Sequence, residues 1–538
     1  MKVAELTKSG SLGRAVLPAK RKETMMTLWG RWLPAFVASL AVLSVASAGP
    51  LDLVNPPQGR FLDEWAEIHI AGGKVGYLHS TMARQGDRIH TQTETRIRMG
   101  RVDTPVAIEI TESTIETLAG IPESFATVMD LSVMKSSMRG TVTDGKVTIV
   151  SSQFGMEQTQ TFDFPKGALM TWGLYREALR RGFAPGLRYK VKVYAPELRL
   201  DDAIDAETVV GEWEPLTIKG KGLRGQRVTV VLTAPIGSTE LISWVDESGR
   251  PLKAVVPAAG LGDMVVITTD QATALGDFVP PEVFLKTTIQ AKRKIDTKAA
   301  QRITYRIRST TPGAEVGELP TTGMQAPSPN ADGTVTLVVS RQAHRPPEPM
   351  RVGGAPRADL AEYLGSNLMM NTADPKLIAL AKRAGGGETD PYRLGDKLRR
   401  FVSDYIETKS LNIGFATASE VCRTREGDCS EHGVLLAALG RLNKLPSRVV
   451  VGLAYVPSFG GRRDIFGYHL WTQFHIDGRW IDFDAALEET HCSPARIVFA
   501  ASSLKNAGLA DLSLPLLNKI GAIDIDILEI EPTPHGHP

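Results

Sequence analysis

Cysteine is scarce in this chain of 538 residues, which contains only Cys422, Cys429 and Cys492. So few cysteines exclude a fold built on disulfides, and their odd number leaves at least one thiol free. If Cys422 pairs with Cys492, the free thiol is Cys429. Connectivity cannot be read from sequence alone, so this disulfide and a redox role for Cys422 beside Cys429 both stay open.

An excess of charge of one sign is also missing, because 62 Lys and Arg residues stand against 60 Asp and Glu residues. Nothing in this balance indicates a nucleic acid or an anionic membrane as partner, and we predict no nucleic-acid binding. The chain also lacks a glycine-rich phosphate loop and a cluster with metal-ligand spacing. We therefore predict no cofactor and no metal site.

Long apolar runs are limited to a single one, from Leu33 to Ala48, which follows several basic residues and ends Ala46-Ser47-Ala48. A basic region, a short apolar segment and an A-x-A pattern predict an export signal over residues 1–48, cleaved after Ala48. The run is shorter than the roughly 18–20 apolar residues of a membrane span, although retention as an anchor stays open. We expect a protein of the periplasm, the cell envelope or the extracellular space.

The remaining composition, 42% hydrophobic and 23% charged residues, is that of a globular protein, and the length indicates about three domains. Residues 60–275 alternate apolar or β-branched with polar residues, as in Arg88–Met99 and Val106–Thr117. This period predicts antiparallel strands with one buried face, and Asp144-Gly145 predicts a hairpin. We expect a β-rich domain shaped as an open barrel or a sandwich. Within it, Pro165–Arg181 followed by Gly182 predicts one helix.

Residues 280–343 predict a second, smaller β module, either separate, or continuous with the first domain, or a structured linker. Proline and glycine in RPPEP and GGAP then place an exposed linker at residues 344–357. From residue 358 to 530 the period becomes helical, with Asp374-Pro375 as the start of one helix and apolar positions from Leu394 to Ile406 forming another. An alternating segment predicts a last strand at Ile523–Ile530, before a disordered tail at residues 531–538.

The thiol of Cys429 stands in a chemically favourable place. It follows Gly427-Asp428 and precedes an apolar helical stripe, and Asp428 with Glu431 matches a capping box, so we predict that a helix begins at or just before Cys429. The positive end of a helix dipole and its free N–H groups favour a thiolate and can stabilise an oxyanion. Taken alone, Cys429 fits a small buried residue equally well.

Two further residues favour the interpretation of Cys429 as a nucleophile. Alternation in GYHLWTQFHI puts His469, Trp471 and Gln473 on one face of a strand, and Gly478–Trp480 makes the turn to the next strand, which ends at Asp484. Adjacent strands let the aspartate orient the imidazole, whose other nitrogen then faces the thiol. We predict a Cys429–His469–Asp484 triad, with Asp482 as the reserve for the third position.

These motifs resemble the transglutaminase-like superfamily, the papain-related cysteine fold, in its exported bacterial form. The resemblance covers roughly residues 360–500 and rests on four matches, which are Gly427-Asp428-Cys429, Leu445–Gly452 (LPSRVVVG), His469-x-Trp471 and Trp480-x-x-x-Asp484. It implies an α+β fold in which Cys429 is the nucleophile, His469 the general base and acid, and Asp484 the orienting residue. The chain departs from the family pattern at Ala485, where proline is common, and at Gln473, where an acidic residue is usual.

The resemblance implies acyl transfer at a peptide or side-chain amide bond, by hydrolysis or by transamidation, on a protein or peptide substrate. The alternative is an envelope binding or assembly module that uses the β-rich half and has little or no catalysis. Envelope association and the oligomeric state stay open. Among neighbouring residues we read Glu431 as a helix cap, His432 as a helix-surface residue and Arg448 as structural.

Overall fold

The computed structural model describes most of the chain, in ranges that leave out the predicted export signal and linker. The described residues are 52–101, 104–131, 134–153, 156–234, 237–258, 262–283, 285–311, 313–342, 358–409, 416–505, 512 and 519–532. Within these ranges no helix is long and apolar enough to cross a membrane.

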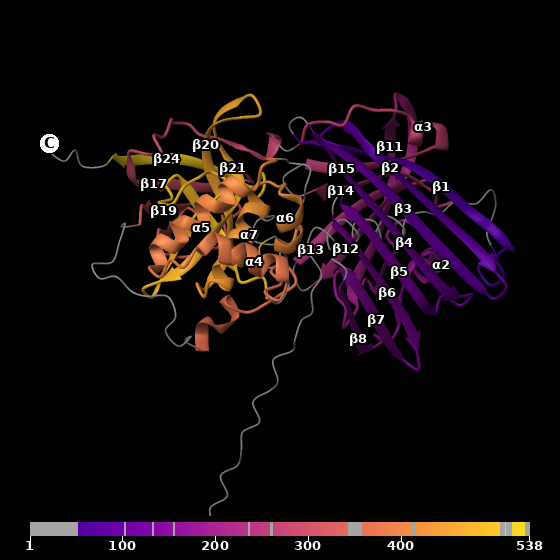
Figure 1. Cartoon of the computed structure of the whole chain (residues 1–538). Helices are drawn as coiled ribbons and strands as arrows, with labels where there is room; N and C mark the ends of the chain where they lie inside the picture. Colours follow the sequence, from indigo (N-terminus) through magenta and orange to yellow (C-terminus); the bar gives the residue numbers. More distant parts are fainter. Residues whose placement is uncertain are drawn as a thin grey trace, which may run out of the picture.

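A single sheet of fifteen strands forms the N-terminal half of the molecule, drawn in indigo and magenta in Figure 1. Its first eight strands are β1 (Gly59–Ile70), β2 (Gly73–Gln85), β3 (Arg88–Arg101), β4 (Thr104–Thr117), β5 (Pro122–Leu131), β6 (Met134–Thr143), β7 (Lys146–Gln153) and β8 (Met156–Asp163). The others are β9 (Ala168–Leu169), β10 (Arg188–Val193), β11 (Ile204–Ile218), β12 (Lys221–Ala234), β13 (Gly237–Val245), β14 (Pro251–Ala258) and β15 (Gly262–Thr269).

The order of the strands is a meander folded back on itself, β8 to β1 and then β15 to β9, so that β8 and β9 form the two edges. Neighbouring strands are antiparallel except for β9 and β10. Residues from both halves share one core, for example Ile110 of β4 and Val230 of β12. Nearer the edges, Ile149 of β7 packs in one cluster with Tyr194, which follows β10. The sheet therefore curves around a common interior, which confirms the predicted antiparallel, open architecture.

The helix predicted at Pro165–Arg181 is wrong at its start. The structure places α2 at Thr171–Arg181, and the preceding residues turn through Gly167, whose φ is +73°, into the short strand β9. Proline at position 165 therefore begins a turn, since the N–H of Ala168 donates to the carbonyl of Pro165. The predicted end is right, because Gly182 terminates the helix with a positive φ.

The C-terminal region has three layers, a group of helices and two sheets. The helices are α4 (Pro375–Gly385), α5 (Pro391–Tyr405), α6 (Ala418–Thr424) and α7 (Cys429–Leu442). The middle sheet contains β16 (Ile289–Gln290), β20 (Ser447–Phe459), β21 (Arg462–Ile476), β22 (Arg479–Phe483) and β23 (Arg496–Ser502). The outer sheet contains β17 (Ala300–Ser309), β18 (Gln325–Pro329), β19 (Val335–Ser340) and β24 (Ile523–Pro532). Short additional elements are α3 (Gln271–Leu275), η1 (Leu285–Thr287) and η2 (Ala358–Tyr363).

Two cores hold these layers together. On one face of the middle sheet, Leu470 and Phe474 of β21 pack against the helices. Further along the same strands, Leu453 of β20 and Phe466 of β21 pack against the outer sheet, for example against Tyr305 of β17. A sheet buried on both faces explains why β20 reads as a continuous apolar run rather than an alternating one.

Residues 280–343, which the sequence suggests as a small β module, contribute to both sheets of the C-terminal region. β16 pairs with β21, and β17 pairs with β24, more than 200 residues further along the chain. Residues 344–357, predicted as a linker, lie outside the described residues, and strands from both sides of them pair in the outer sheet.

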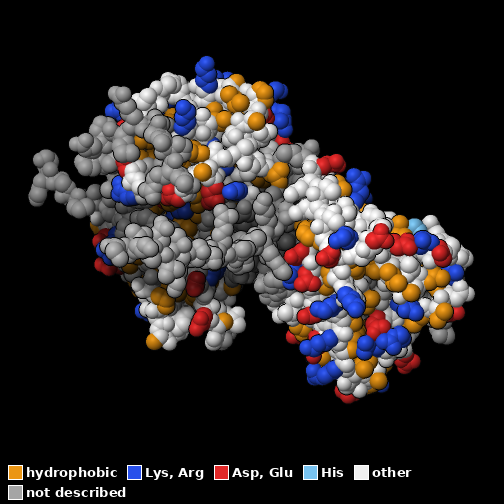
Figure 2. All heavy atoms as spheres, turned by 90° about the horizontal axis from the view of Figure 1, so that it is seen from below, with side chains coloured by type: hydrophobic (Ala, Val, Ile, Leu, Met, Phe, Trp, Pro, Cys, Tyr) orange, Lys and Arg blue, Asp and Glu red, His pale blue; other side chains and the backbone are white. Residues whose placement is uncertain are grey.

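Charge is evenly mixed on the surface of the β-rich half. Figure 2 shows Lys and Arg side chains interspersed with Asp and Glu side chains over this lobe. Cross-strand ion pairs account for part of the pattern, such as Lys146 with Asp163 and Lys192 with Asp205. This face carries no field of one sign that would attract a polyanion, in keeping with the near-zero net charge.

Candidate active site

The thiol of Cys429 lies at the first residue of α7, and its side chain is partly buried. Asp428 is the N-cap, with its carboxylate accepting from the N–H of Ser430 at 2.9 Å. Glu431 completes the predicted capping box by accepting from the N–H of Asp428, also at 2.9 Å. Cys429 thus lies in the first turn, where the positive end of the helix dipole favours a thiolate and an oxyanion.

The glycine of the Gly427-x-Cys429 motif is required by close packing. Glu431 is fully buried, and burial raises the pKa of its carboxyl well above the usual range. A Cβ on Gly427 would lie 2.2 Å from the Cβ of Glu431, and the φ of Gly427 is +158°. Any side chain at position 427 would therefore displace the cap that begins the helix of Cys429.

Two other glycines bring α7 against β21, the strand of His469. A Cβ on Gly433 would lie 2.2 Å from Leu470, and a Cβ on Gly440 would lie 2.3 Å from the ring of Phe474. The hydroxyl of Thr472 donates to the carbonyl of Gly433 at 2.8 Å, which joins helix and strand directly. These contacts set the distance between the helix that begins at Cys429 and the strand that carries His469.

We expect Gly440→Ala to destabilise this packing, because the added methyl would overlap the rigid, fully buried ring of Phe474. Overpacking costs about 1–3 kcal/mol and outweighs the gain in helix propensity of up to about 1 kcal/mol. Hydrogen exchange of the α7 amides should become faster. Gly467→Ala is the matched control, since a Cβ there meets nothing within 4 Å. Unchanged or slower exchange in Gly440→Ala would show that α7 has room to move away from β21.

His469 and Asp484 form a close buried pair. His469 is on β21, Asp484 directly follows β22, and the Nε2 of the imidazole lies 2.7 Å from the Oδ2 of the carboxylate. Their side chains are only 9% and 1% exposed. Because Asp484 occupies Nε2, the nitrogen left for a reacting group is Nδ1.

The carboxylate of Asp484 has several partners. Its Oδ1 accepts from the N–H groups of Ala486 at 3.0 Å and Leu487 at 2.9 Å. Its Oδ2 also lies 2.7 Å from the Nη1 of Arg496. Burial alone would raise the pKa of Asp484, but the charges of His469 and Arg496 and these hydrogen bonds hold that pKa far below the usual range. Asp484 is therefore ionised at neutral pH.

Asp482, the reserve for the third position of the triad, has other hydrogen-bond partners. Its Oδ1 accepts from the Nε1 of Trp471 and, at 3.0 Å, from the Nε2 of Gln473. Burial raises its pKa. The oxygen of Gln473 in turn accepts from the Nε of Arg448 at 2.7 Å, and the guanidinium of Arg448 lies over the ring of Trp480. Asp482 thus belongs to a structural network on the strand face of His469, next to the His469–Asp484 pair, and Arg448 has the structural contacts we expected.

Thr408 and Lys409 connect the loop before Cys429 with the loop after Asp484. The N–H of Gly427 donates to the carbonyl of Thr408 at 3.0 Å. The next residue, Lys409, forms an ion pair with Glu488 at 3.3 Å. His432, one turn after Cys429, also feels the charge of Asp484. The first turn of α7 therefore lies close to the His469–Asp484 pair.

The prediction that His432 lies on the helix surface is wrong. Its side chain is buried, its Nδ1 donates to the carbonyl of Asp428 at 2.6 Å, and burial lowers its pKa. Sequence reasoning missed Arg496 altogether. This residue begins β23, which pairs with β20 rather than with the strand of Asp484, so no local period indicates their contact.

None of the three cysteines forms a disulfide, so the one considered between Cys422 and Cys492 is not formed. Cys422 packs against the helical core, whereas Cys492 is buried in the core between the two sheets. Burial raises the pKa of both thiols. Neither therefore competes with a thiol at a helix N-terminus as the reactive one.

In the part of the chain that the structure describes, no group of three or more His, Cys, Asp or Glu side chains is arranged to hold a metal ion. The candidate site itself offers a thiol, an imidazole and a carboxylate. These groups lie on one helix and a sheet within an α+β domain, the arrangement of the papain-related cysteine folds.

Comparison with known proteins finds a family model that matches part of the chain. Residues 378–485 match the family model of the transglutaminase-like superfamily, so the chain contains a transglutaminase-like domain. A solved structure of a candidate cysteine protease from Cytophaga hutchinsonii has 17% identity and a TM-score of 0.28, covering 45% of this chain and 91% of that one. A candidate protease from Parabacteroides distasonis has 10% identity and a TM-score of 0.18, covering 66% and 64%. No curated protein matches the chain.

Proposed function

We propose that this chain is an exported transglutaminase-like cysteine enzyme that transfers acyl groups at peptide or side-chain amide bonds. The observation that carries the proposal is the 2.7 Å contact between His469 and Asp484. The neighbouring strands β21 and β22 bring these two residues together, beside the helix that begins at Cys429. Cys429 is the nucleophile, His469 the general base and acid, and Asp484 the residue that orients the imidazole.

The first half-reaction forms a thioester. The Nδ1 of His469 takes the proton of the Cys429 thiol, and the sulfur attacks the carbonyl carbon of an amide. The oxygen then carries the negative charge, which the positive end of the α7 dipole stabilises. As the C–N bond breaks, the imidazolium gives its proton to the leaving amine, and the acyl group stays on sulfur.

The second half-reaction decides the product. His469 takes a proton from water or from an amine, and the resulting nucleophile attacks the thioester carbon. The C–S bond breaks and Cys429 is regenerated. With water the outcome is hydrolysis, and with an amine it is transamidation. We propose hydrolysis of a protein or peptide substrate as the main reaction, with transamidation as the second.

An amine-donor assay tests this proposal. The protein is incubated with a glutamine-rich polypeptide and a fluorescent primary amine, and ammonia, new N-termini and bound fluorescence are measured. Hydrolysis predicts new N-termini or ammonia without fluorescence, whereas transamidation predicts ammonia with fluorescence. Each product should vanish in Cys429→Ala. If wild type forms no product on any of a panel of peptides, the alternative gains support, namely a binding or assembly module that relies on the β-rich half.

A further inference from the structure

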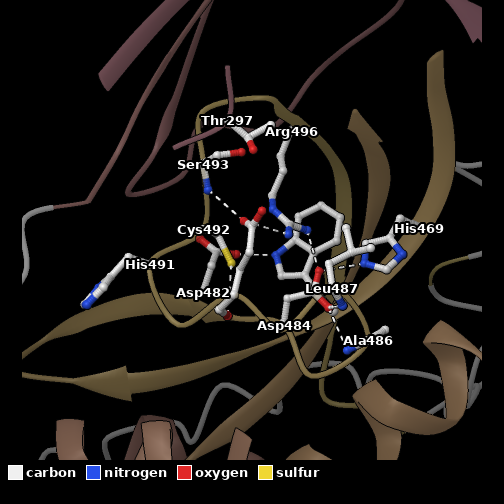
Figure 3. A network of polar contacts seen from close by, with 12 residues as sticks. Thr297, His469, Asp482, Asp484, Ala486, Leu487, His491, Cys492, Ser493 and Arg496 are labelled. Carbon is white, nitrogen blue, oxygen red and sulfur yellow. Dashed lines mark hydrogen bonds and ion pairs between the residues drawn. The ribbon is translucent and has the colours of Figure 1, made fainter. Parts of the chain in front are cut away.

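Arg496 forms the innermost part of the site. It is the first residue of β23, its side chain is 3% exposed, and its Nη1 lies 2.7 Å from the Oδ2 of Asp484. That same oxygen lies 2.7 Å from the Nε2 of His469. Figure 3 shows the guanidinium and the imidazole approaching Asp484 from different sides. The aspartate is thus shared between an imidazole and a permanent cation.

The guanidinium is held from two further directions. Its Nη2 donates to the Oε2 of Glu489 at 3.1 Å, and its central carbon lies 5.2 Å from the ring centre of Trp471. The ring of Trp471 is itself held by Asp482 and is stacked on that of His469, with their centres 6.0 Å apart. Contacts with the carboxylates of Asp484 and Glu489 and with the ring of Trp471 leave the Arg496 guanidinium little freedom to turn away from Asp484.

A buried carboxylate without a counter-ion would bring a full negative charge next to the imidazole. That charge would stabilise the imidazolium, and it would oppose both a thiolate and a tetrahedral oxyanion in the same small site. Arg496 cancels most of this charge but leaves the oxygen geometry unchanged. The pair then acts on the imidazole as a dipole rather than as a full negative charge.

We infer that Arg496 is a positioning residue that makes Asp484 an orienting group of little net charge, and that it thereby sets the pH range in which Cys429 and His469 react. The inference rests on the proposed function, since it assigns Arg496 a part in the same site.

The other ionisable groups around the pair contribute less fixed charge. Glu489 shares Arg496, but its side chain is 27% exposed and screened by solvent. Burial raises the pKa of Asp482 and of the Cys492 thiol, and it lowers the pKa of His432, so each of these is shifted towards its neutral form. The Lys409–Glu488 pair is exposed. Asp484 and Arg496 are therefore the dominant charges beside His469.

The test measures the rate at which iodoacetamide alkylates Cys429 as a function of pH, with peptide mass spectrometry to identify the modified thiol. This rate follows the thiolate and needs neither substrate nor turnover. In Arg496→Met the uncompensated Asp484 should disfavour the thiolate, so the midpoint should rise by about one pH unit. The rate below the midpoint should accordingly fall about tenfold.

Three variants make the test specific. Arg496→Lys keeps the positive charge, so its midpoint should stay close to that of wild type. The double variant Arg496→Met with Asp484→Asn removes both buried charges, so its midpoint should lie below that of Arg496→Met, although its rate constant falls because His469 loses its orienting carboxylate. Arg448→Met is the matched control, since Arg448 is also a mostly buried arginine of this sheet but bonds Gln473 instead of Asp484. Its midpoint should not move.

The outcomes separate this inference from the proposed function. If His469→Ala leaves the alkylation profile of Cys429 unchanged, the triad itself fails. If His469→Ala alters the profile but Arg496→Met lowers the rate equally at every pH, Arg496 only supports the fold and the inference is overturned. An equal shift in Arg448→Met would also overturn it, because the effect would then come from any buried cation.

Discussion

Replacing Cys429 by alanine is expected to abolish product formation, with kcat/KM falling at least about 10⁴-fold while the fold is retained. Both half-reactions pass through a bond to its sulfur, so no neighbouring group can substitute for it. The loss of one partly buried thiol at the start of α7 removes little packing, which leaves the domain intact. The measurement is initial rate against substrate concentration, with circular dichroism to verify folding.

Cys422→Ala is the matched control for this experiment. Cys422 is also partly buried and packs in the same core, but its pKa is raised by burial and its carbonyl accepts from the hydroxyl of Tyr405. Its replacement should change kcat/KM by no more than about threefold. Comparable losses in the two variants would mean that the thiols matter for folding and that Cys429 has no separate chemical part.

Replacing Asp484 by asparagine should lower kcat by about 10²- to 10⁴-fold. The amide can donate to the Nε2 of His469. The imidazole proton would then lie on Nδ1, which could no longer act as a base. The variant also leaves Arg496 buried without its carboxylate, at a cost of about 3–5 kcal/mol in stability. The measurement is kcat, together with the midpoint of urea unfolding.

Asp482→Asn, two residues away on the same strand, is the control for Asp484→Asn. Asp482 accepts from Trp471 and Gln473, and an amide oxygen can accept from both. We therefore expect less than a tenfold change in kcat. A larger loss in Asp482→Asn than in Asp484→Asn would exchange the roles of the two aspartates.

Features set by local sequence were predicted well. α4 begins after Asp374, α5 ends at Tyr405, and α7 begins at Cys429 with its capping box, because caps and helical periods involve residues close together in the chain. The hairpin at Asp144-Gly145 formed for the same reason, since both residues adopt the positive φ that a tight turn requires.

Features set by distant pairing were not predictable from the sequence. The contact of Arg496 with Asp484 depends on the order of strands in the middle sheet, in which β20 lies between β21 and β23. The pairing of β17 with β24 likewise depends on contacts across more than 200 residues. The start of α2 was also predicted wrongly, because a proline can begin either a helix or a turn. At Pro165 it begins a turn, and a short strand follows before α2. Nothing within a few residues of these positions encodes the outcome.

Of the candidate site, the His469–Asp484 contact followed from the expectation of two consecutive strands joined by a tight turn. The burial of His432 did not follow, because its position on α7 is interpretable only once β21 and the neighbouring loops are in place. The same applies to Gly433 and Gly440, whose importance lies in the approach of Leu470 and Phe474.

The central claim, that His469 activates the thiol of Cys429, is tested most directly by a mechanism-based thiol probe. Wild type, Cys429→Ala and His469→Ala are treated with the same peptide-based electrophile, and the labelling rate is measured at neutral pH. We predict rapid labelling of wild type at Cys429, none in Cys429→Ala, and a rate lower by at least about 10²-fold in His469→Ala. Equal labelling of His469→Ala and wild type would contradict the account.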